Sequence, residues 1–358
     1  MAIKYLEIKS TLDNSDFKKQ FISSQEKLVP IIVSFCNTYD DFYKIIKKYR
    51  QKDSKIILHP VKGNKENEIK ALIGLGLYIS FSNNTFNDEK WAQKIVLMTP
   101  QNKIIINNEG KFLIDERKVG NAFEEIISKI SLMKKNASKD DITRIASYNA
   151  VKIFHLRKDL KDKYVYKIRN SLYLNITNRC SNNCDFCPRL EEPVVKGHYL
   201  KIKKEPTTEK VIKDIKSFGD LKKFDEIIFC GYGESTTRID VVKKVAKWLK
   251  NKGCKIRINT NGHANLIAKR NVLPELAGLF DVISISLNFH KGNLYNKHCR
   301  PIFNNTFDGI LEFAKEAKKV CPKVILSVVS GCKDVDVEKC RSIAQKVGVN
   351  FRERTYYK

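Results

Sequence analysis

Residues 172–189, LYLNITNRCSNNCDFCPR, decide how this sequence is interpreted. The stretch begins with the apolar–polar alternation of a half-buried strand and continues with Cys180, Cys184 and Cys187 in a Cys-x3-Cys-x2-Cys spacing. Thiolates on one short loop suit a compact iron–sulfur cluster, and three of them leave one iron of a four-iron cluster open. A structural zinc site is the alternative, but it wants a fourth ligand, and His198 lies outside the usual zinc spacing.

A strand, a turn and an amphipathic helix recur on both sides of this stretch, which indicates parallel α/β architecture. In the second half the pattern predicts a partial barrel, in which ligands bind at the carboxyl ends of the strands. Its six strands are expected at 171–176, 226–230, 255–259, 282–287, 323–329 and 350–354. Its helices are expected at about 208–218, 238–252, 272–279, 306–320 and 335–347.

The first half repeats the pattern. Its strands are expected at 4–8, 30–34, 55–58, 76–81 and 103–106, and its helices at 16–26, 40–50, 66–73, 87–94, 119–134 and 139–154. Ser138 suits the N-cap of the last helix. The stretch 157–169, RKDLKDKYVYKIR, is dense in charge and weak in pattern, and predicts a linker between a domain at 1–156 and a domain at 170–358.

The composition is basic, with 67 Lys and Arg against 40 Asp and Glu in 358 residues, a formal charge of +27. Such a surface attracts polyanions, so nucleic acid is a candidate partner. Lysines scattered over ordinary solvated faces explain the same charge. Neither a membrane-spanning run nor a signal-peptide core is visible, so we expect a cytoplasmic protein without disulfides. Cys321, Cys332 and Cys340 are too widely spaced to favour an auxiliary cluster.

The strand followed by Cys-x3-Cys-x2-Cys resembles the radical-SAM superfamily, in which this motif follows the first strand of a partial (βα)6 barrel. The aromatic Phe186 before the last cysteine fits that pattern. The resemblance implies a [4Fe–4S] cluster on Cys180, Cys184 and Cys187, whose open iron chelates the amino and carboxylate groups of S-adenosylmethionine (SAM). One electron from the cluster then cleaves SAM into methionine and a 5′-deoxyadenosyl radical, which removes hydrogen from a substrate.

Polar residues at other strand ends resemble further family elements. Gly231, Gly233 and Glu234 in FCGYGES match a Gly-x-Gly-Glu element that holds the methionyl amine, with Ser235 in place of the usual Pro. In INTNG the family often has an acid at the position of the first Asn, and an ordinary Asn-Gly turn is the alternative explanation of this motif. Arg352 and Arg354 face one side of the last strand and suit an anionic substrate or the cofactor carboxylate. The alternative, which is the more common case, is a pair of arginines that is solvated or salt-bridged. The cofactor-binding residues expected from the resemblance are Phe186, Gly231, Gly233, Glu234, Asn259, Asn261, Ser286 and Asn288.

Ser286 and Asn288 are assigned to the ribose hydroxyls because alternate residues of a strand point the same way. A polar strand face without a ligand explains them equally well. The segments LYLNITNRC, FCGYGE, INTNG, RNVLPELAGLFDVISISLN and YNKHCRP together resemble the TatD-associated group of radical-SAM proteins, over residues 172–354. This resemblance leaves the substrate open.

The first half resembles the later part of TatD-family metal-dependent hydrolases, through GLYISFS at 76–82 and ASYNAVKIF at 146–154. Those proteins are (βα)8 barrels with a two-metal site. Against that pattern Glu7 falls at the bridging Glu, Ser34 and His59 at histidines, and Glu109 at the Asp. The opening His-x-His strand is absent. We therefore expect an incomplete TatD-like (βα) barrel half without hydrolase activity, whose open edge strand packs on the other domain, on a second copy or on another protein.

The leading hypothesis is a radical-SAM enzyme of unknown substrate, with SAM and one [4Fe–4S] cluster as cofactors. It would be oxygen-sensitive and would need a one-electron donor protein such as flavodoxin or ferredoxin. The alternative is a nucleic-acid-associated protein in which the TatD-like half directs the other domain to RNA or DNA. A third reading is a structural metal site without catalysis.

Overall fold

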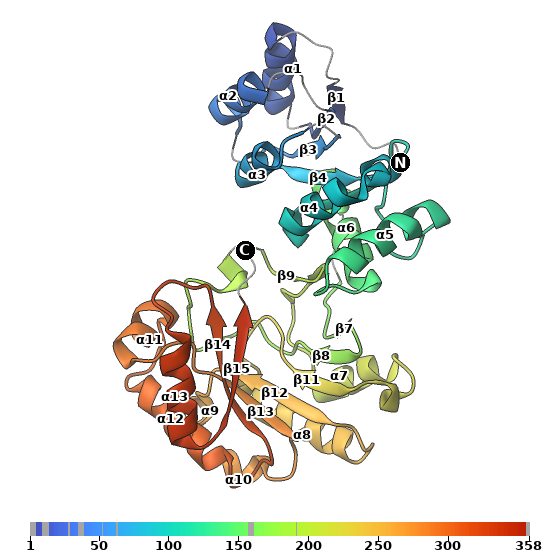
Figure 1. The fold of residues 1–358 in the computed structure, drawn as a ribbon. Helices are drawn as coiled ribbons and strands as arrows, with labels where there is room; N and C mark the ends of the chain where they lie inside the picture. The colour runs from blue at the N-terminus through green and yellow to red at the C-terminus, as the bar shows by residue number, and fades with distance from the viewer. Residues whose placement is uncertain are drawn as a thin grey trace. The chain divides into compact units, whose positions relative to one another are not determined.

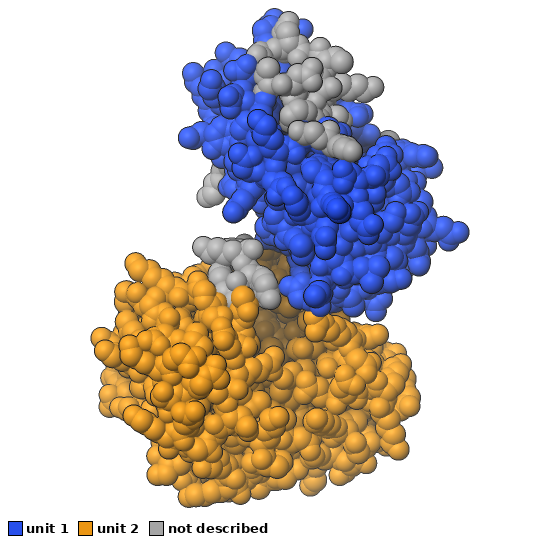
Figure 2. All heavy atoms as spheres, in the orientation of Figure 1, with its two compact units in different colours: residues 1–160, 196–198 blue, residues 161–195, 199–358 orange. Residues whose placement is uncertain are grey.

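The computed structural model describes residues 5–8, 14–27, 29–34, 39–51, 53–61, 64–156, 161–190 and 192–355. The chain forms two compact units, one of Met1–Leu160 with Lys196–His198 and one of Lys161–Val195 with Tyr199–Lys358, shown in blue and orange in Figure 2. Both are α/β, as the sequence predicts.

The first unit holds a sheet in the order β1-β2-β3-β4-β5-β6, in which neighbours from β1 to β5 are parallel and β6 returns antiparallel to β5. Its strands are β1 (Leu6–Ile8), β2 (Ile31–Ser34), β3 (Ile56–His59), β4 (Tyr78–Phe81), β5 (Ile104–Asn108) and β6 (Lys111–Phe112). Its helices are α1 (Asn14–Glu26), α2 (Tyr39–Tyr49), α3 (Glu66–Gly74), α4 (Glu89–Met98), α5 (Asn121–Met133) and α6 (Lys139–Ile153). Within the described ranges β1 pairs with β2 alone, so the edge-packing expectation stays a prediction.

The second unit holds a curled sheet in the order β15-β14-β13-β12-β11-β8-β7. Its strands are β7 (Val165–Ile168), β8 (Ser171–Leu174), β11 (Glu226–Phe229), β12 (Ile256–Thr260), β13 (Val282–Ser286), β14 (Val324–Ser330) and β15 (Asn350–Thr355). Its helices are α7 (Thr208–Lys216), α8 (Ile239–Lys250), α9 (Ala264–Ala268), α10 (Leu273–Leu276), α11 (Gly292–Cys299), α12 (Thr306–Ala317) and α13 (Val337–Val347). Two short strands, β9 (Val194–Val195) and β10 (His198–Tyr199), precede α7 in the chain.

The two units also contain short 3-10 helices. They are η1 (Asn83–Asn87), η2 (Gln101–Lys103), η3 (Pro188–Leu190), η4 (Leu221–Lys223) and η5 (Ser235–Arg238).

The two faces of the curled sheet differ in chemistry because side chains alternate along each strand. Leu172, Leu174, Ile227 and Phe229 point outward into the main core, where α8 and its neighbouring helices cover them (Figure 1). α8 buries Val242, Val245, Ala246 and Leu249, the spacing of one helix face. The alternate residues of the strands line the opposite, concave face, which is rich in polar groups. The predicted site residues therefore lie on the concave face or at the carboxyl ends of its strands.

Three details differ from the sequence-based expectation. The linker expected at 157–169 is shorter, because residues 165–168 form β7, whose Val165 and Tyr166 are buried against β8. α9 and α11 are additional helices. β13 ends at Ser286, and Asn288 has a φ of 59°, so the two do not share a strand face as expected. Residues 157–160 lie outside the described residues.

Candidate functional site

The cysteine loop leaves the carboxyl end of β8 and carries Cys180, Cys184 and Cys187, all half-buried. Its last turn is closed by a hydrogen bond from the Cys187 amide to the Cys184 carbonyl, at 3.2 Å. Burial, with a smaller contribution from the charge of Glu234, raises the pKa of Cys180 to about 12. A hydrogen bond with the Cys299 thiol lowers the pKa of Cys184.

The end of α11 fixes the middle of this loop. The amides of Asn183 and Asp185 donate to the carbonyls of Cys299 and His298, at 2.9 and 3.0 Å, and the Ile302 amide donates back to the Ser181 carbonyl at 3.0 Å. These are main-chain bonds, so the path of the cysteine loop depends on the segment 298–302. Its residues 298–301 are the second half of the YNKHCRP motif at 295–301, whose role the sequence alone does not show.

Arg189 fastens the loop from its other side. Its Nε donates to the Cys187 sulfur at 3.2 Å, and its Nη1 and Nη2 donate to the carbonyls of Asn178 and Asn182 at 3.3 and 3.0 Å. The guanidinium also lies over the Tyr232 ring, 5.7 Å from its centroid. A cation that donates to a ligand sulfur favours the more reduced, more negative state of a cluster. Sequence reasoning missed this residue, although it lies within the deciding stretch.

We expect Arg189→Gln to lower the reduction potential of the reconstituted cluster by on the order of tens of millivolts, because a positive charge and a sulfur hydrogen bond are lost. A potentiometric titration followed by electron paramagnetic resonance measures the shift. Arg179→Gln is the matched control, since Arg179 precedes the same loop but is exposed and paired with Glu205 at 2.9 Å. Equal shifts in both variants would show that net charge, and not the hydrogen bond to Cys187, sets the potential.

Two glycines let the turn after β11 approach the start of the cysteine loop. A Cβ on Gly231 would lie 2.3 Å from the Asn175 side chain, and one on Gly233 would lie 2.4 Å from the Arg179 carbonyl oxygen. The amides of Gly233 and Glu234 donate to the carbonyls of Thr177 and Arg179, at 3.0 and 2.8 Å. Both glycines are thus required by close backbone approach.

The Glu234 carboxylate joins the ends of β11 and β12. It is 5% exposed and accepts from the Thr236 amide and hydroxyl, the Thr260 hydroxyl and the Asn261 amide, at 2.7 to 3.0 Å. Burial raises its pKa, and these hydrogen bonds oppose that shift. Within the described part of the chain no donor reaches the carbonyls of residues 231–233. Those carbonyls are therefore the acceptors that this turn offers to a ligand.

A buried polar chain continues from Asn261 into the cysteine loop. Asn261 Nδ2 donates to the Ser181 hydroxyl at 2.8 Å, and that hydroxyl lies 3.0 Å from His263 Nδ1. His263 Nε2 lies 3.0 Å from the Tyr295 hydroxyl, which accepts from Asn182 Nδ2 at 2.8 Å. Ser181 and Asn182 lie between the first two cysteines, so these hydrogen bonds hold the cysteine loop against β12 and α11.

His263 makes this buried hydrogen-bond network sensitive to acid. Burial lowers its pKa from 6.5 to about 4, because a charged imidazolium is disfavoured in the protein interior. The unfolded chain then binds the proton more tightly than the folded chain. Its contribution to stability is present above pH 6.5 and is lost as the pH falls toward 4.

We expect the free energy of unfolding to fall by about 2 kcal/mol between pH 6.5 and about pH 5 from His263 alone. Urea unfolding at a series of pH values measures this slope. His263→Gln keeps a polar side chain but removes the titration, and should flatten the slope in that window. An unchanged slope in His263→Gln would contradict the assignment.

The remaining predicted residues are placed as follows. Phe186 is half-buried, with its ring centroid 6.1 Å from that of Phe289. Asn259 points to the concave face, and its Oδ1 is buried without a partner. Ser286 accepts from Arg354 Nη2 at 3.4 Å. Asn288 Nδ2 contacts the Cys299 sulfur at 3.8 Å, and its Oδ1 is also buried without a partner.

Comparison with protein families identifies both halves. Residues 174–341 match the radical SAM superfamily, and residues 11–155 match the TatD related DNases. The chain combines a radical-SAM domain with a TatD-related domain. No curated protein matches it.

Three solved structures resemble parts of this chain. They are methylornithine synthase PylB (16% identity, TM-score 0.37), SuiB of Streptococcus suis bound to S-adenosylmethionine (14%, 0.37) and the methyltransferase TsrM of Kitasatospora setae with tryptophan and a SAM analogue (12%, 0.35). The matches cover 52%, 67% and 95% of this chain, and 53%, 45% and 64% of those chains. The chain thus spans about half to two thirds of the length of these structures.

The donor set on the cysteine loop matches the thiolate ligands that a [4Fe–4S] cluster takes. Among the residues that the structure describes, no three His, Cys, Asp or Glu side chains converge as ligands of one metal ion. Ligands of a four-iron cluster bind different irons and have no need to converge on a point. Three half-buried thiols on one loop, with Arg189 donating to one sulfur, meet that requirement.

Cys321, Cys332 and Cys340, the cysteines considered for an auxiliary cluster, do not come together in the radical-SAM domain. Cys321 and Cys340 are buried in the core. Cys321 precedes β14 and Cys332 follows it, so this 7-residue strand, about 23 Å long, separates them. They are too far apart to ligate one auxiliary cluster.

The TatD-related unit keeps only part of the hydrolase pattern. His59 ends β3, and its pKa is lowered by burial, although the negative charge of Glu7 opposes that shift. Glu109 is exposed in the β5–β6 turn, with a φ of 49°. Ser34 lies in β2 beside His59, and its side chain is outside the described atoms. The absence of hydrolase activity stays a prediction.

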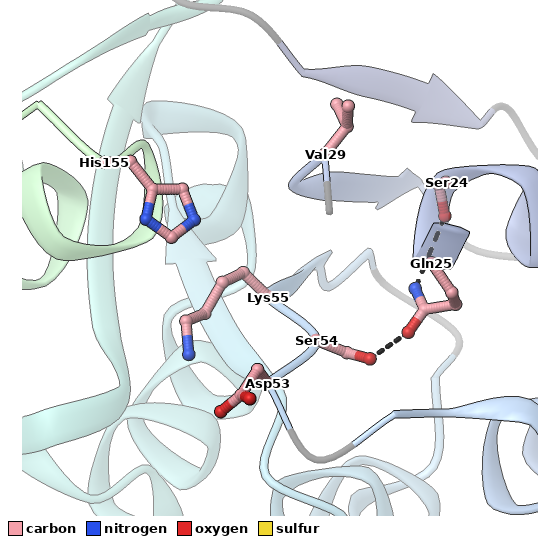
Figure 3. Close-up of a pocket in the computed structure, with 7 residues that line it drawn as sticks. All are labelled: Ser24, Gln25, Val29, Asp53, Ser54, Lys55 and His155. Carbon is pink, nitrogen blue, oxygen red and sulfur yellow. Dashed lines mark hydrogen bonds between the residues drawn. The ribbon is translucent and has the colours of Figure 1, made fainter. Parts of the chain in front are cut away.

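A pocket of about 400 Å³ in the TatD-related unit is lined by Ser24, Gln25, Val29, Asp53, Ser54, Lys55 and His155 (Figure 3). Val29 and Lys55 precede β2 and β3, so the pocket lies at the amino ends of the strands. Figure 3 shows Ser24, Gln25 and Ser54 joined by hydrogen bonds on one side of it. In βα barrels function resides at the opposite, carboxyl ends. We therefore assign no function to this pocket.

Within the described residues no helix is long and apolar enough to span a lipid bilayer.

Proposed function

We propose that this protein is a radical-SAM enzyme whose Cys180, Cys184 and Cys187 hold a [4Fe–4S] cluster and whose substrate is still to be found. The observation that carries the proposal is the cysteine loop itself. It stands at the carboxyl end of β8, in a domain of the radical SAM superfamily, and both Arg189 and α11 fix its path. When bound, the cluster would supply the electron that splits SAM into methionine and a 5′-deoxyadenosyl radical, and the radical would take hydrogen from the substrate.

The residues around the loop suit the binding of SAM. The carbonyls of residues 231–233 can accept from the methionyl ammonium, while the buried Glu234 carboxylate orients their turn. Asn259 and Asn288 each keep a buried side-chain oxygen without a partner, as ligand-binding groups do before the ligand arrives. Ser286 and Asn261 add further polar side chains at the carboxyl ends of the strands. Phe186 of the cysteine loop packs against Phe289. A donor protein such as flavodoxin or ferredoxin would provide the electron.

Formation of 5′-deoxyadenosine tests the proposal. The protein is purified without oxygen, reconstituted with iron and sulfide, reduced with dithionite and incubated with SAM. Product is expected from the reconstituted protein and not from the apoprotein. A well-formed cluster with SAM bound and no product in either the presence or absence of cell extract would contradict it.

A nucleic-acid-associated role is the second candidate. The charge of +27 and the match to TatD related DNases favour it. It requires binding to RNA or DNA that weakens as salt rises. It ranks second because the charge and the family match do not show where on the chain a nucleic acid would bind.

A further inference from the structure

The concave face of the radical-SAM sheet carries more positive charge than its known groups neutralise. The register of the parallel strands puts Asn259 beside Ser284, Ser286 beside Ser327, and Ser327 beside Arg352. Arg354 follows Arg352 on the same face, since alternate residues point the same way. None of these residues belongs to the outer hydrophobic core.

Three arginines meet on this face. Arg257 on β12 and Arg352 on β15 both act electrostatically on Arg354, and both also act on the Tyr173 hydroxyl of β8. β8 and β15 lie near opposite ends of the strand order. The curl of the sheet therefore brings their side chains together over the concave face.

Among the residues that the structure describes, Arg257 alone of these three cations has a carboxylate partner. Arg257 Nη2 pairs with Glu226 at 2.8 Å, whereas Arg354 has a single long bond, to the Ser286 hydroxyl at 3.4 Å. The Nε atoms of Arg257 and Arg354 are buried without acceptors. Within the described ranges no Asp or Glu pairs with Arg352 or Arg354. Burial and the like charges of Arg352 and Arg257 lower the pKa of Arg354, and the Cys230 thiol opposes this shift. Such an arrangement is costly unless an anion completes it.

We propose that Arg257, Arg352 and Arg354 form the binding site for an oxyanion, a carboxylate or phosphate group, carried by the substrate. Guanidinium groups match both oxyanions through paired N–H donors. This inference rests on the proposed function and narrows its substrate to an anionic molecule. If the cluster binds the methionyl carboxylate of SAM, as the family resemblance implies, a second anion is needed to satisfy the arginines.

Anion binding is measured by the rise of the unfolding temperature with added inorganic phosphate or acetate, since a ligand of the folded state stabilises it in proportion to its occupancy. We expect phosphate or acetate to stabilise the wild-type protein and to bind Arg354→Gln about tenfold more weakly. Arg352→Gln should weaken anion binding to the same extent, and because Arg352 is exposed this substitution leaves the buried core unchanged. Arg341→Gln is the control, because Arg341 pairs with Glu338 at 3.2 Å on α13 and removes the same charge.

An equal response of Arg341→Gln and of both test variants would overturn the proposal, because it would assign anion binding to the general surface charge. The anion could belong to the substrate or to the carboxylate of SAM, and equilibrium binding of SAM to the reconstituted proteins distinguishes the two. Loss of SAM binding in Arg352→Gln and Arg354→Gln would assign the arginines to the cofactor carboxylate and also overturn the proposal. Failure of the wild type to form 5′-deoxyadenosine would instead refute the proposed function, while the phosphate and acetate titrations would remain readable.

Discussion

The Cys184→Ala variant is expected to form 5′-deoxyadenosine only at the rate of the apoprotein. Cys184 is the middle one of the three proposed cluster ligands, and two thiolates are too few to retain a cluster that needs three. Iron and sulfide content after reconstitution, the visible absorbance of the cluster and the product assay are measured together. All three should fall, because the variant loses the cluster and not merely the reaction.

The control for this result must remove a cysteine without touching the site. Cys254→Ala is a suitable control, because Cys254 is 7% exposed and precedes β12. It therefore lies at the amino ends of the strands, whereas the cysteine loop follows the carboxyl end of β8. Its cost should be confined to stability, at about 1 kcal/mol. Cluster content and product formation should stay at wild-type values.

One thiol is close enough to replace the missing ligand. Cys299 is fully buried, and its thiol is hydrogen-bonded to Cys184. If Cys184→Ala keeps a partial cluster, the Cys184→Ala/Cys299→Ala double variant should lose it. A full cluster in the double variant would show that the loop does not carry it, and would reject the assignment of all three ligands.

The local part of the site is predictable from sequence because its signals are local. The strand alternation before Cys180 and the spacing of the three cysteines are features of one continuous stretch, and the structure places that loop at a strand end. The same holds for the capping Ser138, whose hydroxyl accepts from the Asp141 amide at 3.2 Å. Here propensity, pattern and position agree.

The support of the site is not predictable in this way, because it depends on contacts between distant residues. His263 reaches Ser181 across 82 positions, and Asn182 reaches Tyr295 across 113. Nothing in the neighbourhood of His263 in the sequence marks it as part of the cysteine loop. The prediction that Asn288 shares a strand face with Ser286 was wrong for a related reason. The alternation of residue types does not show that β13 ends at Ser286.

Gly233→Ala is expected to cause the largest loss of stability among simple substitutions near the site, about 3 kcal/mol. The added Cβ would lie 2.4 Å from the Arg179 carbonyl oxygen and 2.7 Å from backbone atoms of Asn178 and Thr177. Backbone atoms cannot rotate away as a side chain can. The turn after β11 must therefore move, which breaks the amide bonds to Thr177 and Arg179 that hold the start of the cysteine loop.

Urea unfolding measures the loss of stability, and iron content after reconstitution measures its effect on the loop. Gly309→Ala is the matched control, because a Cβ there meets only the Leu266 side chain, at an ordinary 3.7 Å, inside α12. Alanine in a helix interior should raise the stability by about 0.5 to 1 kcal/mol. If Gly233→Ala were as stable as the wild type and held a full cluster, the close approach of the two turns would not be what positions the cysteines, and the brace from Glu234 through Asn261 to Ser181 would have to carry that role alone.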